Sequence, residues 1–283
     1  MRYQITSDST CDLSPEQLER YNIRLLPLYV SMDGKTLRDG VDVKPDDIYA
    51  HVSAGGSLPQ TAAVNLADYV RAFTELSEKN DFVIHVCISL DFSCCYQNAK
   101  LAAADFDNVY VVDSRNLSTG HGLVVLEAER MAREGMEPDD IVAALHDLTG
   151  RVEASFILDR LDYMKKGGRC SAVTLLGANL LKLKPCIQVK NGKMDVAKKY
   201  RGKYDEVLKQ YIREKVTDYS DIVLDRVFIT HAGCDSKLVD EIVALVKELA
   251  PFKEVYMTRA GCTVSSHCGA NTLGVLFIRK SPL

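Results

Sequence analysis

The sequence predicts an α/β protein whose mostly parallel sheets are covered by helices and divided between two domains. Short apolar runs that fit buried strands alternate with segments whose apolar residues recur every three or four positions, as in helices. This alternation is typical of parallel sheets with helical crossovers. A length of 283 residues is long for one hydrophobic core and comfortable for two. No Pro/Gly-rich linker stands out, so we expect N-terminal and C-terminal α/β domains over 1–150 and 151–283, between which the chain can cross more than once.

In the N-terminal half, four apolar runs fit strands, at residues 3–6, 23–30, 82–88 and 109–112. A first helix is expected after Ser14, which can act as its cap, with Pro15 at the first helical position and Gln17 completing a capping box. Asp33 and Gly34 are typical of a hairpin turn. Together these signals predict strand, helix and hairpin before residue 40.

A second helix is expected after Asn65, which can cap it. Its apolar residues share one face at spacings of three and four: Leu66, Tyr69, Val70, Phe73 and Leu76. A longer helix begins at about Gly120.

The C-terminal half repeats the pattern. Strands are expected at 156–158, 227–230 and 274–278. Helices are expected at 175–183, started by Ser171, and at 237–249. Asn191 and Gly192 predict a hairpin over 187–196.

The charge balance argues against a nucleic-acid partner, because 35 Lys and Arg are outnumbered by 39 Asp and Glu. One basic cluster, which includes Lys198 and Arg201, is as well explained by a solvated surface. The first residues lack the apolar core of a secretory signal, and no apolar run is long enough for a transmembrane segment. The nine Cys are scattered without a C-x-x-C pair. We therefore expect no metal site and a cytoplasmic protein with reduced thiols.

Hydroxyl-rich junctions follow three predicted strands, at residues 6–10, 89–93 and 113–116. Ligands of α/β proteins bind beyond the carboxyl ends of strands, where helix N-termini offer free N–H groups to anions. A single junction of this kind is also explained by a turn that satisfies its own backbone. Dinucleotide, P-loop and α/β-hydrolase motifs are absent, so no cofactor is expected. His267 lies in a polar, Gly-containing segment that we expect to be a loop.

Several of these segments together resemble the DegV family over essentially the whole chain. The opening ITSDSTCDLSPE is similar to I-x-x-D-S-x-x-D-L, and RLLPL followed by RDGVD is similar to a P-L and D-G-x-D pair. LPQTAAVN stands where the family has a T-S-x-P loop, and ISLDFSCCYQNA resembles S-S-x-L-S-G-T-Y-Q-x-A. LDYMKKGGRCS and HCGANTLG resemble L-x-Y-L-x-K-G-G-R-I-S and H-x-G-P-G-x-x-G.

The resemblance implies a two-domain fold that buries one long-chain fatty acid, such as palmitate, stearate or oleate. It implies that the acid is presented to the catalytic subunit of a fatty acid kinase, and that this chain, expected to be a monomer, has no catalytic residues. The positions implied to bind the ligand, with Arg201 added from the basic cluster, are Thr61, Ala62, Ser93, Cys94, Arg169, Arg201 and His267. Ala62 and Cys94 depart from the family's Ser and Gly.

Two other functions stay open on the sequence. The first is an autonomous hydrolase or phosphotransferase that uses Ser93 with His267, which would require a third group to orient the imidazole. The second is a protein that binds another amphiphile or small acid and has no kinase partner.

Overall fold

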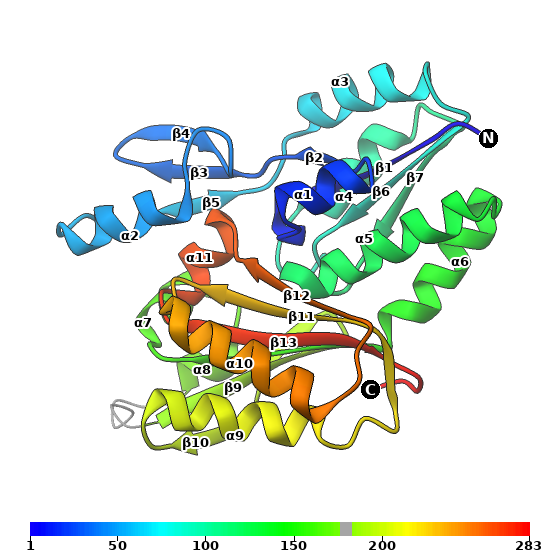
Figure 1. Ribbon diagram of the computed structural model, residues 1–283. Coiled ribbons are helices and arrows are strands. Elements are labelled where there is room, and N and C mark those ends of the chain that lie inside the picture. Colours follow the sequence, from blue (N-terminus) through cyan, green and yellow to red (C-terminus); the bar gives the residue numbers. More distant parts are fainter. Residues whose placement is uncertain (176–182) are drawn as a thin grey trace.

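The computed structural model describes residues 1–175 and 183–283, in which two main sheets are joined through one long helix (Figure 1). The N-terminal sheet is parallel and has the strand order β2-β1-β6-β7. Its strands are β1 (Tyr3–Asp8), β2 (Arg24–Leu26), β6 (Phe82–Cys87) and β7 (Val109–Asp113). The elements around it are η1 (Ser9–Cys11), α1 (Pro15–Arg20), α3 (Leu66–Ser77), α4 (Cys95–Ala103), α5 (Ser118–Arg133) and α6 (Pro138–Thr149).

A smaller antiparallel sheet projects from this layer, at the left of Figure 1. It has the order β4-β3-β5 and carries one helix. These elements are β3 (Tyr29–Met32), β4 (Lys35–Arg38), β5 (Gln60–Ala62) and α2 (Pro45–Ser53).

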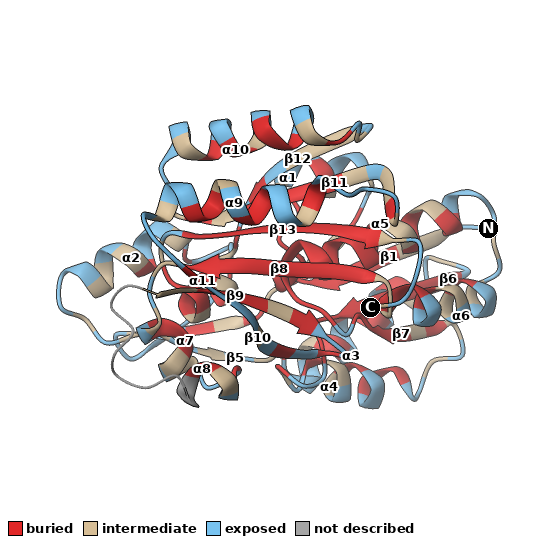
Figure 2. Cartoon of the chain, turned by 90° about the horizontal axis from the view of Figure 1, so that it is seen from below, coloured by how far each residue is buried: buried red, intermediate tan, exposed pale blue. Residues whose placement is uncertain are grey.

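The C-terminal sheet has the order β10-β9-β8-β13-β11-β12. Its strands are β8 (Val152–Leu158), β9 (Leu183–Lys190), β10 (Lys193–Arg201), β11 (Ile222–Ala232), β12 (Glu254–Arg259) and β13 (Thr272–Arg279). The remaining described helices are α7 (Asp162–Gly167), α8 (Ser171–Leu175), α9 (Tyr204–Val216), α10 (Ser236–Leu249) and α11 (Cys262–Cys268). The outer sheet face packs on α9 and α10, and α5 contacts both main sheets. Figure 2 shows β8 and β13 buried between these layers.

The predicted α/β class is confirmed, and the N-terminal sheet is parallel as expected. The C-terminal sheet departs from the expected parallel arrangement, because within the described ranges its parallel pair is β11 with β12 and its other pairings are antiparallel. The β9–β10 connection shows why. Asn191 and Gly192, both at positive φ, form the predicted hairpin, and a turn this short can join only antiparallel strands.

The predicted strand over 23–30 is two strands in different sheets, since Pro27 interrupts the run between β2 and β3. Proline lacks the N–H that a continuing ladder needs. The Ser14 capping box and the Asn65 cap are confirmed. On the second helix, however, Leu66 and Val70 are 40% exposed, so its buried face is narrower than predicted.

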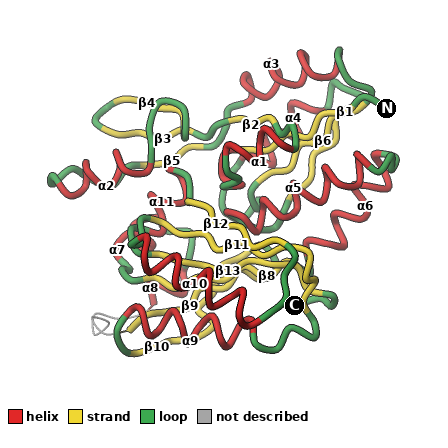
Figure 3. Tube along the Cα trace, viewed as in Figure 1, coloured by secondary structure: helices red, strands yellow, loops and turns green. Residues whose placement is uncertain are grey.

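Two predictions for the C-terminal half need correction, one of a helix and one of a loop. The helix predicted over 175–183 begins at Ser171, but residues 176–182 lie outside the described ranges and Leu183 begins a strand. His267 lies near the end of α11, not in a loop. The tube in Figure 3 shows α11 beside β5, which is some 200 residues earlier in the chain, and these elements are in contact. No helix in the described part of the chain is long and apolar enough to cross a membrane.

Candidate functional site

A pocket of about 390 Å³ lies where β5, α11 and the turn after β6 meet. Six of the seven predicted site residues line it: Thr61, Ala62, Ser93, Cys94, Arg169 and His267. Arg201 is an exposed residue at the end of β10 and is not part of the lining. Most of the remaining wall is apolar and includes Leu28, Ile88, Leu117, Met164, Met194 and Val264. The pocket therefore combines a small polar set with an apolar wall, which is the usual composition of a small-molecule site.

The contact that joins the two halves of the pocket is between Thr61 and His267. Thr61 is placed by β5, where it pairs with Val30 of β3. Its Oγ1 is 2.8 Å from His267 Nε2. If Nε2 donates to Thr61, the threonine hydroxyl keeps its own proton for a ligand acceptor, because a hydroxyl can accept and donate at once.

The imidazole of His267 is neutral at physiological pH. Burial, reinforced by the nearby Arg169 charge, lowers the His267 pKa to about 4. Its Nδ1 is buried and has no hydrogen-bond partner among the described residues. A Cβ added at Gly167 would lie 2.3 Å from this nitrogen, so only glycine at position 167 permits the observed ring position. Close packing against Gly167 thus fixes the Nδ1 side of the ring, and the contact with Thr61 fixes the Nε2 side.

The N-terminus of α11 is held by two carboxylates from the other half of the chain. Asp39 accepts from the backbone N–H groups of Cys262 and Thr263, at 2.8 and 3.0 Å. Asp12 accepts from the N–H of Gly261 at 2.8 Å. These N–H groups would otherwise lack helical partners. Burial raises the pKa of Asp12 to about 8, so Asp12 acts here as a hydrogen-bond acceptor and not as a full negative charge.

Asp39 and Asp12 were not among the predicted site residues. Both lie in matched segments of the sequence, Asp12 in ITSDSTCDLSPE and Asp39 in RDGVD. The sequence signal was therefore present, but their partners on α11 are more than 200 residues away. Their role is to fix the helix that carries His267.

Ser93 and Arg169 also line the pocket. Ser93 precedes α4 by two residues, and its Oγ accepts from the N–H of Cys95 at 3.3 Å. Arg169 donates to the carbonyl oxygens of Gly167 and Phe92, at 2.8 and 3.4 Å. In the described ranges it makes no ion pair with a carboxylate. A guanidinium held by carbonyl groups alone keeps its charge for an anion.

The geometry disfavours an autonomous Ser/His enzyme at this pocket. His267 Nε2 is engaged by Thr61, and no described contact joins His267 to Ser93. No described carboxylate accepts from His267 Nδ1, whereas a nucleophilic site needs a group that orients its base. Across residues 1–175 and 183–283, no cluster of His, Cys, Asp or Glu is arranged to hold a metal ion.

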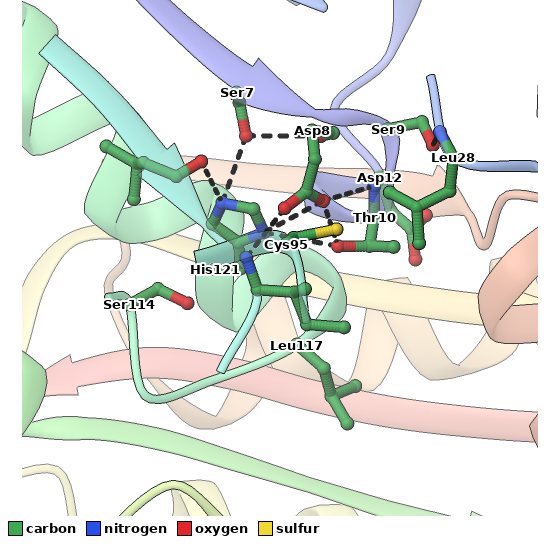
Figure 4. A network of polar contacts seen from close by, with 12 residues as sticks. Ser7, Asp8, Ser9, Thr10, Asp12, Leu28, Cys95, Ser114, Leu117 and His121 are labelled. Atoms are coloured by element: carbon green, nitrogen blue, oxygen red, sulfur yellow. Dashed lines mark hydrogen bonds and ion pairs between the residues drawn. The ribbon is translucent and has the colours of Figure 1, made fainter. Parts of the chain in front are cut away.

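The first hydroxyl-rich junction, at residues 6–10, forms a separate polar network that does not line the pocket (Figure 4). Asp8 accepts from the backbone N–H groups of Thr10 and Ile88, at 3.0 and 2.7 Å. His121 Nε2 lies 3.0 Å from both Ser7 Oγ and the carbonyl oxygen of Val86. A carbonyl can only accept, so Nε2 carries the proton and cannot act as a base toward Ser7. The side chains of Ser7, Asp8, Thr10 and His121 are almost wholly buried.

Comparisons with known proteins agree on one family. The family model described as "Uncharacterised protein, DegV family" matches residues 2–280. A DegV domain-containing protein of Caldanaerobacter subterraneus subsp. tengcongensis is 29% identical over 280 residues, which cover 98% of each chain.

Solved structures show the same fold. One, described as fatty acid binding of a DegV family protein from Thermus thermophilus, has a TM-score of 0.90 at 30% identity and covers 99% of this chain and 100% of that one. DegV from Bacillus subtilis, described as a fatty acid binding protein, has a TM-score of 0.85 at 26% identity, with 99% and 100% covered. A stearic acid-binding protein from Eubacterium ventriosum has a TM-score of 0.84 at 27% identity, with 98% of each chain covered.

Proposed function

The chain belongs to the DegV family, and from this premise we propose that it binds one long-chain fatty acid in the pocket described above. The observation that carries the proposal is the Thr61–His267 pair in a pocket whose remaining wall is largely apolar. The carboxylate would accept from the hydroxyls of Thr61 and Ser93, with Arg169 supplying positive charge. The acyl chain would lie against the apolar wall.

The free energies are of the right order for this ligand. Each buried methylene contributes roughly 0.8 kcal/mol, so ten contribute about 8 kcal/mol, which corresponds to about micromolar affinity before entropic costs. The acyl chain then supplies most of the affinity. The polar residues orient the acid and select a carboxylate over a neutral head group.

We further propose that the bound acid is presented to the catalytic subunit of a fatty acid kinase and that this chain catalyses no step itself. Arg169 supports presentation of the acid to a kinase, because its side chain is exposed and a guanidinium binds a phosphate through two parallel hydrogen bonds. The sequence has no P-loop motif, so ATP and Mg²⁺ would come from the partner. In this proposal the protein is a cytoplasmic monomer.

Lipid that co-purifies with the recombinant protein tests the binding proposal. Denaturing extraction followed by mass spectrometry should recover about one fatty acid per chain. Protein that is consistently empty, and that also fails to take up palmitate, stearate or oleate, would contradict it. Recovery of a different amphiphile would assign the pocket to that ligand instead.

The partner requirement is tested by incubating the loaded protein with ATP and Mg²⁺, with and without a fatty acid kinase catalytic subunit. Acyl phosphate, trapped with hydroxylamine, is expected only when the subunit is present. Formation without it would favour an autonomous phosphotransferase.

A further inference from the structure

A second cavity, of about 310 Å³, lies where α5 and α6 meet the C-terminal sheet, and it shares no lining residue with the first pocket. Its floor is apolar: Met131, Ala144, Leu148, Val223 and Ile278. Its charged residues are Glu127, Arg130, Asp147, Arg151, Asp225 and Arg226. The cavity is therefore lined by helices α5 and α6 on one side and by strands β11 and β13 on the other, and both sides contribute charged side chains.

The three guanidinium groups in this cavity are unequally paired. Arg130 has carboxylate partners at 2.9 and 2.6 Å, Glu127 and Glu134. The side chain of Arg226 is only 15% exposed, and within the described ranges its ion pair is a 3.8 Å contact with Glu127, beyond hydrogen-bond range. Glu127 is already engaged by Arg130. Arg226 is thus a largely buried charge with one weak, shared partner.

Two donors in the cavity have no protein acceptor. The Nε atoms of Arg151 and Arg226 are buried and lack hydrogen-bond partners in the described ranges. A buried charged donor without an acceptor destabilises a fold more than a neutral donor does. A planar pair of acceptor oxygens matches the donor fork of a guanidinium, and it is what a carboxylate provides.

Arg226 is the cavity cation that the described carboxylates neutralise least. Arg151 and Glu127 already have close partners, since Arg151 pairs with Asp147 at 3.0 Å and Glu127 accepts from Arg130 at 2.9 Å. Asp147 and Asp225 are 74% and 56% exposed, so solvent screens them, and Asp225 also pairs with Lys253 at 2.6 Å. A bound carboxylate that reaches Arg226 would neutralise its charge away from solvent.

We propose that this second cavity binds a small organic monoanion, a carboxylate with a short apolar body, through Arg226 and Arg151. The carboxylate accepts from the two guanidinium groups, and the apolar body lies on the floor formed by residues such as Met131 and Val223. This site is independent of the proposed fatty-acid pocket. Because its walls come from both halves of the chain, an occupant stabilises their contact by mass action.

Hexanoate is a suitable probe, with hexanol as a neutral match of the same length. At about 10 mM, well above a dissociation constant of about 1 mM, hexanoate should raise the melting temperature of the full chain, and hexanol should not. The rise should be lost in Arg226→Met and kept in Arg169→Met, which removes the guanidinium of the other pocket instead. Measured on protein whose first pocket is saturated with palmitate, this pair of variants assigns the effect to the second cavity.

Arg226→Met should leave the melting temperature of the unliganded protein unchanged or higher, because it removes a charge with one weak partner. If that variant does not fold, Arg226→Lys keeps the charge but loses the bidentate fork, and it should weaken hexanoate binding severalfold by NMR titration. The proposal would be overturned if hexanoate did not stabilise the natural sequence, or if hexanol stabilised it equally. It would also be overturned if Arg226→Met kept the full stabilisation or Arg226→Lys bound hexanoate undiminished.

Discussion

Two regions of the molecule contain the same kinds of residue: hydroxyls, an imidazole and nearby carboxylates. One is the pocket at Thr61 and His267, and the other is the buried polar network at Asp8 and His121, called the sealed network below. In the sealed network the polar atoms are saturated, since Asp8 accepts two backbone N–H bonds and His121 donates to a carbonyl. In the pocket, the Thr61 hydroxyl keeps a proton to donate if His267 Nε2 donates to it, and within the described ranges Arg169 is held by carbonyl oxygens and by no carboxylate. The first arrangement uses its hydrogen-bonding capacity internally, and the second keeps some of it.

This difference separates structural from functional polar residues more sharply than residue type does. A buried polar group that is fully paired stabilises the fold, and it is costly to remove. A polar group that faces a cavity with capacity to spare can bind a ligand. Substitutions in the two regions should therefore affect different measurements, and the four predictions below run from the largest expected effect to the smallest.

Asp8→Ala should destabilise the fold by about 3–5 kcal/mol, because it leaves two buried backbone N–H groups without acceptors. Urea unfolding measures the loss. Asp8→Asn, which keeps one acceptor oxygen, is the matched control and should lose less. A loss below about 1 kcal/mol for Asp8→Ala would mean that the network is not the structural element we infer.

Acidification should destabilise the protein partly through His267, by about 3 kcal/mol near pH 4. The folded-state pKa of His267 is lowered to about 4, from an ordinary value near 6.5. The unfolded chain therefore binds a proton first, and this stability is present above pH 6.5 and is lost as the pH falls toward 4. His267→Gln should flatten that part of the stability curve. Burial also lowers the pKa values of His85, His121 and His231, so an unchanged curve would assign the acid sensitivity to these other histidines.

The fold could be predicted from local sequence further than the site could. Helix caps at Ser14 and Asn65 and the Asn191-Gly192 turn depend on neighbouring residues, and all three are confirmed. The antiparallel pairing of β8 with β13 depends on residues more than 100 positions apart. No local periodicity records that pairing, and this is why the expected parallel arrangement does not extend to the second sheet.

For the candidate site, shared motifs predicted which residues line the pocket, but physical reasoning on the sequence did not predict how they are held. Thr61 and His267 are 206 positions apart, and their contact depends on Asp39 and Asp12 anchoring α11. Gly167 was noted only as part of a motif, whereas its missing side chain makes room for the imidazole. Such contacts arise from the packing of distant segments, which a single sequence does not specify.

Thr61→Val should weaken fatty-acid binding about tenfold, roughly the 1.4 kcal/mol of one hydrogen bond, with little change in stability. Thr10→Val is the matched substitution in the sealed network, where the Thr10 hydroxyl contacts Asp8 and His121. It should reduce stability and leave acid affinity unchanged. Displacement of a fluorescent fatty acid and urea unfolding, measured on both variants, distinguish the regions. The same profile for both variants would break the comparison.

Arg201→Ala should have the smallest effect, a change in acid affinity of less than about 0.5 kcal/mol, or roughly twofold. Arg201 is exposed at the end of β10 and does not line the pocket, so solvent screens its charge from a bound carboxylate. Arg169→Ala is the control. Arg169 lies in the pocket lining and can contact a bound carboxylate, but its side chain is also exposed, so we expect a loss of about 1 kcal/mol, or roughly fivefold in affinity.

Measuring both arginine variants for acid affinity and for partner-dependent acyl phosphate formation separates two roles for Arg201. If Arg201→Ala binds acid normally but slows phosphorylation, Arg201 acts on the phosphate or on the partner. If neither quantity changes, the cluster with Lys198 is a solvated surface, in which Lys198 pairs with Glu214 at 2.7 Å. Equal losses of acid affinity for Arg201→Ala and Arg169→Ala would contradict the boundary of the pocket, because an exposed residue outside its lining would then be holding the ligand.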